Sequence, residues 1–100
     1  MASPARNNRR SKDYREMFDR LPERIQKLAL AAFKTFEQNP YHPAFSLHEL
    51  VDHGRGNHKH KSYSVYLTSG YRAIFCVDGD TNVWYWIGSH SDYNNFTGTR

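Results

Sequence analysis

The sequence predicts a single small α+β domain, in which an N-terminal αα-hairpin packs on a small antiparallel β-meander. Two observations predict this order of elements. Apolar residues recur at helical spacing in two consecutive segments of the first 40 residues, and three runs of alternating residues joined by short turns follow after residue 61. The chain has 100 residues, which is a usual size for one domain. We therefore expect one domain over residues 13–96.

Two helices are expected between residues 11 and 39. Ser11 is a suitable N-cap, and an apolar stripe follows it at helical spacing. Pro22 restarts the pattern, because proline is favoured at the first position of a helix. A second stripe ends at Asn39-Pro40. The link at residues 20–22 is so short that the two helices must form a hairpin. The two stripes consist of Tyr14, Met17, Phe18 and Leu21, and of Ile25, Leu28, Ala29, Ala32, Phe33 and Phe36.

The strands are expected in the second half of the chain. Residues 45–50 alternate and predict a short strand, whereas residues 51–61 contain two glycines without apolar periodicity and predict a loop. Three alternating runs follow, at residues 63–68, 71–77 and 83–88. The turn signals between them are Ser69-Gly70 and the stretch DGDTN, so the three strands form an antiparallel meander. A last helical turn is expected at residues 91–96.

Both ends are expected to be loosely held. Residues 1–12 are polar and basic, and they cannot bury enough apolar surface to offset the entropy lost on ordering. They are therefore predicted to form a flexible basic arm, and residues 97–100 a frayed tail.

Charge and cysteine content restrict the class of protein. The formal net charge of +4 fits a polyanionic partner such as nucleic acid, although solubility alone would also explain it. The one cysteine, Cys76, lies in an apolar run, which predicts a buried thiol and fits a reducing compartment. No stretch approaches the roughly 20 apolar residues of a membrane span, and residues 1–12 lack the apolar core of a secretory signal. These features predict a cytoplasmic protein without membrane contact.

Strand direction is expected to bring four polar residues together. Tyr66 lies near the end of the first meander strand, Arg72 near the start of the second, and His90 and Tyr93 follow the third. Because neighbouring antiparallel strands reverse direction, these positions meet at one end of the sheet. The set suits phosphoryl transfer in RNA, since an arginine holds phosphoryl oxygens and a histidine or tyrosine moves protons. Such chemistry needs no metal and no cofactor.

Further residues are candidates for contact with RNA. If no bulge interrupts the strands, Arg72 and His90 share a face with Trp84 and Trp86, and Trp86 is the candidate for stacking on an unpaired base. Simpler explanations exist, because strand arginines often face solvent and paired tryptophans are often core. The predicted loop also supplies basic candidates for phosphate contact, unless it is only a solvated loop. These are Arg55, Lys59, His60 and Lys61. The spacing of its histidines matches no zinc site.

Two stretches resemble a known family, the RelE/ParE toxin superfamily. They are Ser69-Gly70-Tyr71-Arg72-Ala73-Ile74-Phe75 and Trp86-Ile87-Gly88-Ser89-His90-Ser91-Asp92-Tyr93, and the stretch FDRLP and the Asn39-Pro40 stop are similar as well. The resemblance covers about residues 13–96. It implies a sheet backed by a helix hairpin, and a cognate antitoxin that wraps the toxin.

The RelE-like branch of this family implies cleavage of mRNA in the ribosomal A site. An arginine at the position of Arg72 helps to stabilise the scissile phosphate there, and residues near His90 and Tyr93 take part in phosphate contact and proton transfer. RelE-like toxins often carry basic residues on the preceding strand, where this chain has Ser64 and Tyr66. Three functions therefore stay open: a metal-independent mRNA endoribonuclease, which we favour, a ParE-like inhibitor of DNA gyrase, and a decayed relative that only binds an antitoxin. No small-molecule ligand is expected.

Overall fold

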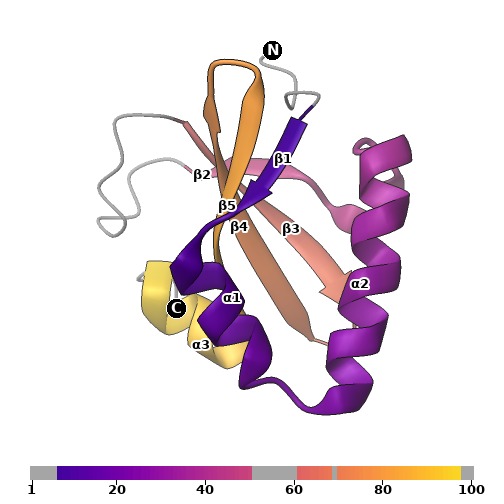
Figure 1. Cartoon of the computed structure of the whole chain (residues 1–100), viewed down its shortest axis with the longest axis vertical. Helices are drawn as coiled ribbons and strands as arrows, with labels where there is room; N and C mark the ends of the chain where they lie inside the picture. The colour runs from indigo at the N-terminus through magenta and orange to yellow at the C-terminus, as the bar shows by residue number, and fades with distance from the viewer. Residues whose placement is uncertain (1–6, 51–60, 69, 98–100) are drawn as a thin grey trace.

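The computed structural model describes residues 7–50, 61–68 and 70–97 of the chain, as a mixed five-stranded sheet with helices on both faces (Figure 1). The strands lie in the order β1-β5-β4-β3-β2, where β1 is parallel to β5 and all other pairs are antiparallel. The strands are β1 (Asn7–Arg10), β2 (His48–Leu50), β3 (Ser62–Thr68), β4 (Tyr71–Asp78) and β5 (Thr81–Ser89). The helices are α1 (Lys12–Asp19), α2 (Glu23–Gln38), a 3-10 helix (Pro43–Phe45) and α3 (His90–Thr97).

The predicted hairpin of helices is confirmed, and its local chemistry is as expected. The Ser11 hydroxyl accepts the backbone N–H of Tyr14 at 3.1 Å, which caps the start of α1. The Gln26 side chain donates to the carbonyl oxygens of Phe18, Asp19 and Leu21 at 3.0, 3.2 and 3.2 Å. These carbonyls lie at the end of α1 and just after it, where the regular bonds of a helix run out, and that of Phe18 also accepts the Leu21 backbone N–H at 3.0 Å. One side chain of α2 therefore fixes the angle at which the two helices meet.

The predicted meander is also confirmed, but the sheet is larger than expected. Residues 7–12 were predicted to belong to a flexible arm, and this is wrong, because residues 7–10 form β1 and α1 begins at Lys12. An exposed edge strand needs no alternation of apolar residues, so the sequence of β1 carries no strand signal. The strand expected at residues 45–50 is shorter, since Phe45 belongs to the 3-10 helix. Residues 1–6 and 98–100 lie outside the described residues.

Side-chain hydrogen bonds fasten β1 to β5. The Asn8 side-chain oxygen accepts from the Asn82 amide at 3.1 Å and from the Trp84 indole N–H at 3.0 Å. Both donor residues have no solvent exposure. A buried donor that loses its acceptor costs stability, so Asn8 strengthens the backbone pairing of β1 with β5.

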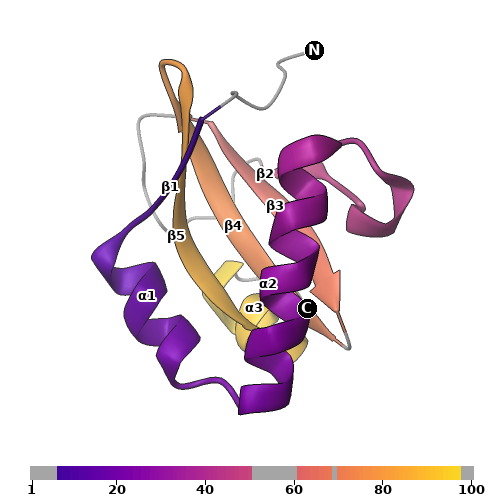
Figure 2. The ribbon, with the colours of Figure 1, turned by 45° about the vertical axis from the view of Figure 1, so that its right-hand side comes forward.

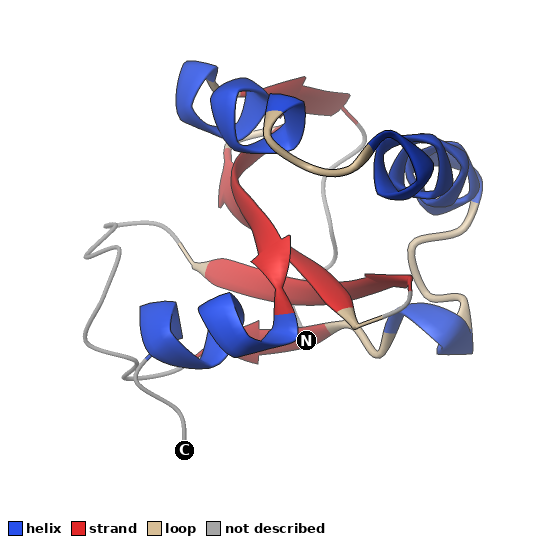
Figure 3. Cartoon of the chain, turned by 90° about the horizontal axis from the view of Figure 1, so that it is seen from below, coloured by secondary structure: helices blue, strands red, loops and turns tan. Residues whose placement is uncertain are grey.

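The two faces of the sheet carry separate apolar clusters. On one face, α1 and α2 cover an aromatic core around Trp84, whose ring centroid lies 4.7–5.3 Å from those of Phe75, Phe36 and Phe33. On the other face, α3 covers a smaller cluster of Ile74, Trp86 and Tyr93. The views turned by 45° and by 90° show the sheet between these two layers (Figures 2 and 3).

A β-bulge in β5 divides the two tryptophans between these faces. Ile74 of β4 is opposite Trp86, whereas the next residue, Phe75, is opposite Trp84, so Tyr85 is the extra residue. A bulge of one residue reverses the alternation of side chains along the strand. Trp84 therefore points toward α2, while Trp86 points toward α3. The prediction that both indoles share the face of Arg72 required a strand without a bulge. Of the two indoles, only that of Trp86 lies on this face.

No helix in the described part of the chain is long and apolar enough to cross a membrane.

We expect Asn8→Ala to lower the free energy of unfolding by about 1–3 kcal/mol, because it removes the acceptor of a buried indole N–H. Urea unfolding followed by tryptophan fluorescence measures this difference. Asn7→Ala, at the exposed neighbouring position, is the control and should change stability little. Equal stability of the two variants would contradict the assigned role of Asn8.

Stability should also fall at alkaline pH through Tyr14. Burial raises the pKa of Tyr14 from 10.0 to about 12, although nearby Arg10 acts to lower it. The folded state therefore retains the phenol proton above pH 10, where the unfolded chain releases it. The contribution is fully present below about pH 10 and is lost as the pH rises toward 12, which amounts to about 2–3 kcal/mol. Urea titrations across this range should show a smaller loss for Tyr14→Phe than for Tyr41→Phe, whose ring is exposed.

Candidate functional site

Arg72 is the centre of the candidate site. It lies on β4 opposite Tyr66 of β3 and Gly88 of β5. It shares the parity of Ile74, so its side chain is on the face that α3 covers. Gly88 has no side chain, and the Trp86 indole packs against it: a Cβ at this position would lie 3.0 Å from the indole ring. A second bulge, between Tyr66 and Thr68, ends the regular pairing of β3 with β4 beside this position.

The Arg72 guanidinium is held by aromatic rings and not by an acid. Its central carbon lies 5.1 Å from the centroid of the Tyr93 ring and 5.7 Å from that of Tyr66. Its Nη1 donates to the Ser64 hydroxyl at 3.4 Å. Among the described residues, no carboxylate forms an ion pair with it. Within the described part of the chain, no acid therefore neutralises this positive charge.

One donor of this guanidinium has no acceptor. The Arg72 Nε is buried and forms no hydrogen bond with a described residue. A buried charged donor in this condition is costly, and native structures contain few of them. An oxygen that binds here would remove that cost.

The start of α3 brings His90 to the same place. The His90 ring stacks on the Tyr93 ring, with centroids 6.2 Å apart and planes at 16°. The His90 backbone N–H donates to the carbonyl of Gly70 in the turn between β3 and β4. The Tyr66 hydroxyl accepts the Gly70 N–H at 3.2 Å, so strand, turn and helix are joined at one point.

The four residues predicted to act in catalysis are thus gathered at one end of the sheet, but their exposure differs. His90 is exposed, and Arg72 and Tyr66 are partly exposed. Tyr93 is only 6% exposed, and its ring contacts Arg72, His90 and Trp86. The imidazole and the guanidinium can therefore meet a ligand directly, whereas the Tyr93 ring holds both of them in position.

The other predicted contact residues are not part of this cluster. Trp86 was predicted to stack on a base, and this is wrong, because it is 6% exposed and stacks on Phe96 with centroids 5.3 Å apart. Trp84 has no exposure at all. Lys61 precedes β3, about 16 Å along the strand from Tyr66. It forms an ion pair with Glu49 at 3.9 Å. Arg55, Lys59 and His60 lie outside the described residues.

Sequence reasoning gave Ser64 and Gly88 no part in the site. Ser64 has the parity of Tyr66 on β3, so it contacts the guanidinium from the same face. Gly88 is opposite Arg72 in the register. The alternation of side chains along the strands could have indicated both residues. The bulge at Tyr85, however, shifts the register of β5 and cannot be recognised from the sequence.

A groove of about 510 Å³ adjoins the cluster at the end of β5. Gly88, Ser89 and Asp92 line it next to the site, and Arg20 and Leu21 line it from the α1–α2 link. Arg72 itself does not line this groove.

A reactive thiol and a group of metal ligands would be two other kinds of reactive site. Cys76 is 5% exposed, as predicted, and burial raises the pKa of its thiol, which disfavours the nucleophilic thiolate. Within residues 7–50, 61–68 and 70–97, no three histidine, cysteine or acidic side chains are grouped as metal ligands would be.

No protein-family model and no curated protein sequence matches the chain. Solved structures do match. A chain of the archaeal RelE–RelB complex of Pyrococcus horikoshii aligns with a TM-score of 0.63 at 17% identity, over 84% of this chain and 93% of that one. A chain of the toxin–antitoxin complex RelBE2 of Mycobacterium tuberculosis aligns with a TM-score of 0.63 at 20% identity, over 87% and 99%.

The chain has the RelE fold. A third similar structure is a copper-bound mutant toxin from Helicobacter pylori, with a TM-score of 0.55 at 18% identity, over 86% of this chain and 96% of that one. The matched regions cover nearly the whole of each solved chain, so the RelE fold accounts for the described domain and not for a part of it. In this RelE fold, the cluster around Arg72 lies between the sheet and α3.

Proposed function

We propose that this chain is the toxin of a type II toxin–antitoxin pair and that it cleaves mRNA on the ribosome in the cytoplasm. The observation that carries the proposal is the Arg72 guanidinium, which has a buried N–H without an acceptor and no acidic partner among the described residues. A phosphate diester supplies the missing oxygens. The similarity to RelE and RelBE2 structures, which are complexes with antitoxins, supports the role of a toxin.

The proposed reaction is attack of a ribose 2′-hydroxyl on the adjacent phosphate. His90, as an exposed imidazole, takes the proton of the attacking hydroxyl. The new bond between the 2′-oxygen and phosphorus forms a cyclic phosphate, and the bond to the 5′-oxygen breaks. The leaving 5′-oxygen takes a proton from solvent water and becomes a 5′-hydroxyl, and His90 later returns its proton to solvent, so the step is balanced without a redox partner.

Arg72 stabilises the negative charge that builds up on the phosphoryl oxygens. Its planar fork fits two oxygens at once, which a lysine cannot do. Tyr66 and Tyr93 are positioning residues, because their rings fix the guanidinium plane. The net charge of +4 raises the rate of association with RNA.

An antitoxin is the proposed protein partner. Leu28 and Leu30 of α2 remain 38% and 43% exposed in the free chain, and an antitoxin helix or strand could cover them.

We expect Arg72→Ala and His90→Ala each to reduce mRNA cleavage by about 10²–10⁴-fold, since one group stabilises the transition state and the other moves a proton. Arg72→Lys should keep only part of the activity. Mapping of mRNA ends after induced expression measures this, and new ends should carry a cyclic phosphate. Arg24→Ala, an exposed arginine of α2, is the control and should stay fully toxic.

A folded Arg72→Ala variant that still cleaves mRNA would exclude this mechanism. Growth arrest with DNA damage and intact mRNA would instead favour the gyrase inhibitor, and harmless expression of the folded chain would favour a relative that only binds an antitoxin.

A further inference from the structure

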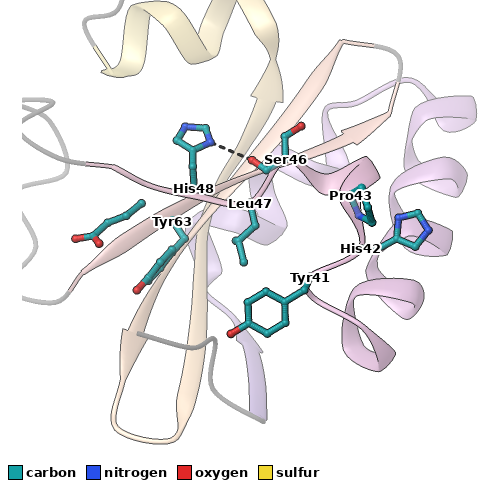
Figure 4. Close-up of a pocket in the computed structure, with 8 residues that line it drawn as sticks. Tyr41, His42, Pro43, Ser46, Leu47, His48 and Tyr63 are labelled. Atoms are coloured by element: carbon teal, nitrogen blue, oxygen red, sulfur yellow. Dashed lines mark hydrogen bonds between the residues drawn. The ribbon is translucent and has the colours of Figure 1, made fainter. Parts of the chain in front are cut away.

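A second pocket lies on the other face of the sheet, at its β2 edge. Its volume is about 350 Å³, and Figure 4 shows the side chains that line it. The Leu47 side chain and the rings of Tyr41 and Tyr63 form its apolar walls. Tyr63 belongs to the aromatic core under α2, so this pocket is separate from the Arg72 site.

One polar group of this pocket lacks a hydrogen-bond partner among the described residues. The Tyr63 hydroxyl is buried without a hydrogen bond, on a residue that is only 4% exposed. Glu49 is directly opposite Tyr63 in the register of β2 and β3. Burial raises the pKa of Tyr63, and Glu49 and then Tyr41 raise it further. All three residues line the pocket. A cation with several N–H donors would satisfy this set of groups.

Glu49 can accept such a cation. Its ion pair with Lys61 is long, at 3.9 Å, and the two side chains are 39% and 62% exposed. Exposed pairs of this kind contribute little, so a better donor can replace Lys61.

The pocket lies beside β2, which is an edge strand of the sheet in the described part of the chain. β2 is the last strand of the sheet, and no further described strand pairs with its outer side. Extended segments of partner proteins add to such edges, and pockets for alternate side chains give them specificity. Tyr41 is 49% exposed at the rim, where it can cover an incoming side chain.

We propose that this pocket takes the arginine side chain of a partner protein, presented by an extended segment that runs beside β2. The planar guanidinium stacks against the tyrosine rings, donates to the Glu49 carboxylate through two N–H groups, and donates to the Tyr63 hydroxyl. The interaction is independent of RNA cleavage, because none of its residues belongs to the Arg72 site.

The test is an NMR titration of the isotope-labelled protein with a capped pentapeptide of valine and threonine that has arginine at its centre. We expect shifts at residues 41–49 and 61–63. The same peptide with citrulline, which has the same shape without the charge, should bind about tenfold more weakly. Glu49→Gln and Tyr63→Phe should each lower the affinity for the arginine peptide by about three- to thirtyfold. Glu37→Gln, at an exposed acid of α2, is the control and should leave the affinity for the arginine peptide unchanged.

Tyr63→Phe must keep the thermal midpoint or raise it, because it removes a buried hydroxyl without a partner. Equal binding of the citrulline peptide, absence of binding, or shifts confined to other elements would overturn the proposal. A single capped arginine that binds as tightly as the peptide would also overturn it, since the occupant would then be a small guanidino compound. Glu49→Gln should cleave mRNA like the unchanged chain, so this result is separate from that of the nuclease test.

Discussion

The β-bulge at Tyr85 places two large indoles on opposite faces of β5, and both layers of the molecule depend on that placement. Trp84 completes the aromatic core under α1 and α2. Its indole N–H donates to the Asn8 side chain and so stabilises the position of β1 beside β5. Trp86 gives α3 an apolar surface to cover on the other face. Without the extra residue, both indoles would compete for one face, and α3 would have little to pack against.

The candidate site follows from this arrangement. Because Trp86 packs against α3, Tyr93 comes to lie against Arg72, and His90 stacks on Tyr93. The guanidinium is then fixed by rings and a hydroxyl, and its charge is left for a ligand. Ring contacts hold the guanidinium without neutralising the charge that a phosphate needs, whereas a buried acid would neutralise it.

The sequence was sufficient for the αα-hairpin, the meander and the gathering of Tyr66, Arg72, His90 and Tyr93, because periodicity and strand reversal are local rules. It was insufficient for β1, whose polar residues join the sheet through tertiary hydrogen bonds that no local pattern encodes. It also failed for the tryptophans, since alternation assumes an unbroken strand and the bulge at Tyr85 breaks it. The pocket beside Tyr63 depends on the chain path through the 3-10 helix, which the alternation at residues 45–50 concealed.

The placement of the two indoles can be measured directly by a NOESY spectrum of the labelled protein in solution. We expect contacts from the Trp84 indole to the Phe33 and Phe36 rings, and contacts from the Trp86 indole to the Tyr93 and Phe96 rings. Contacts from both indoles to α2, with none from Trp86 to α3, would show an unbroken β5. That result would contradict the account of the fold and of the site that is built on it.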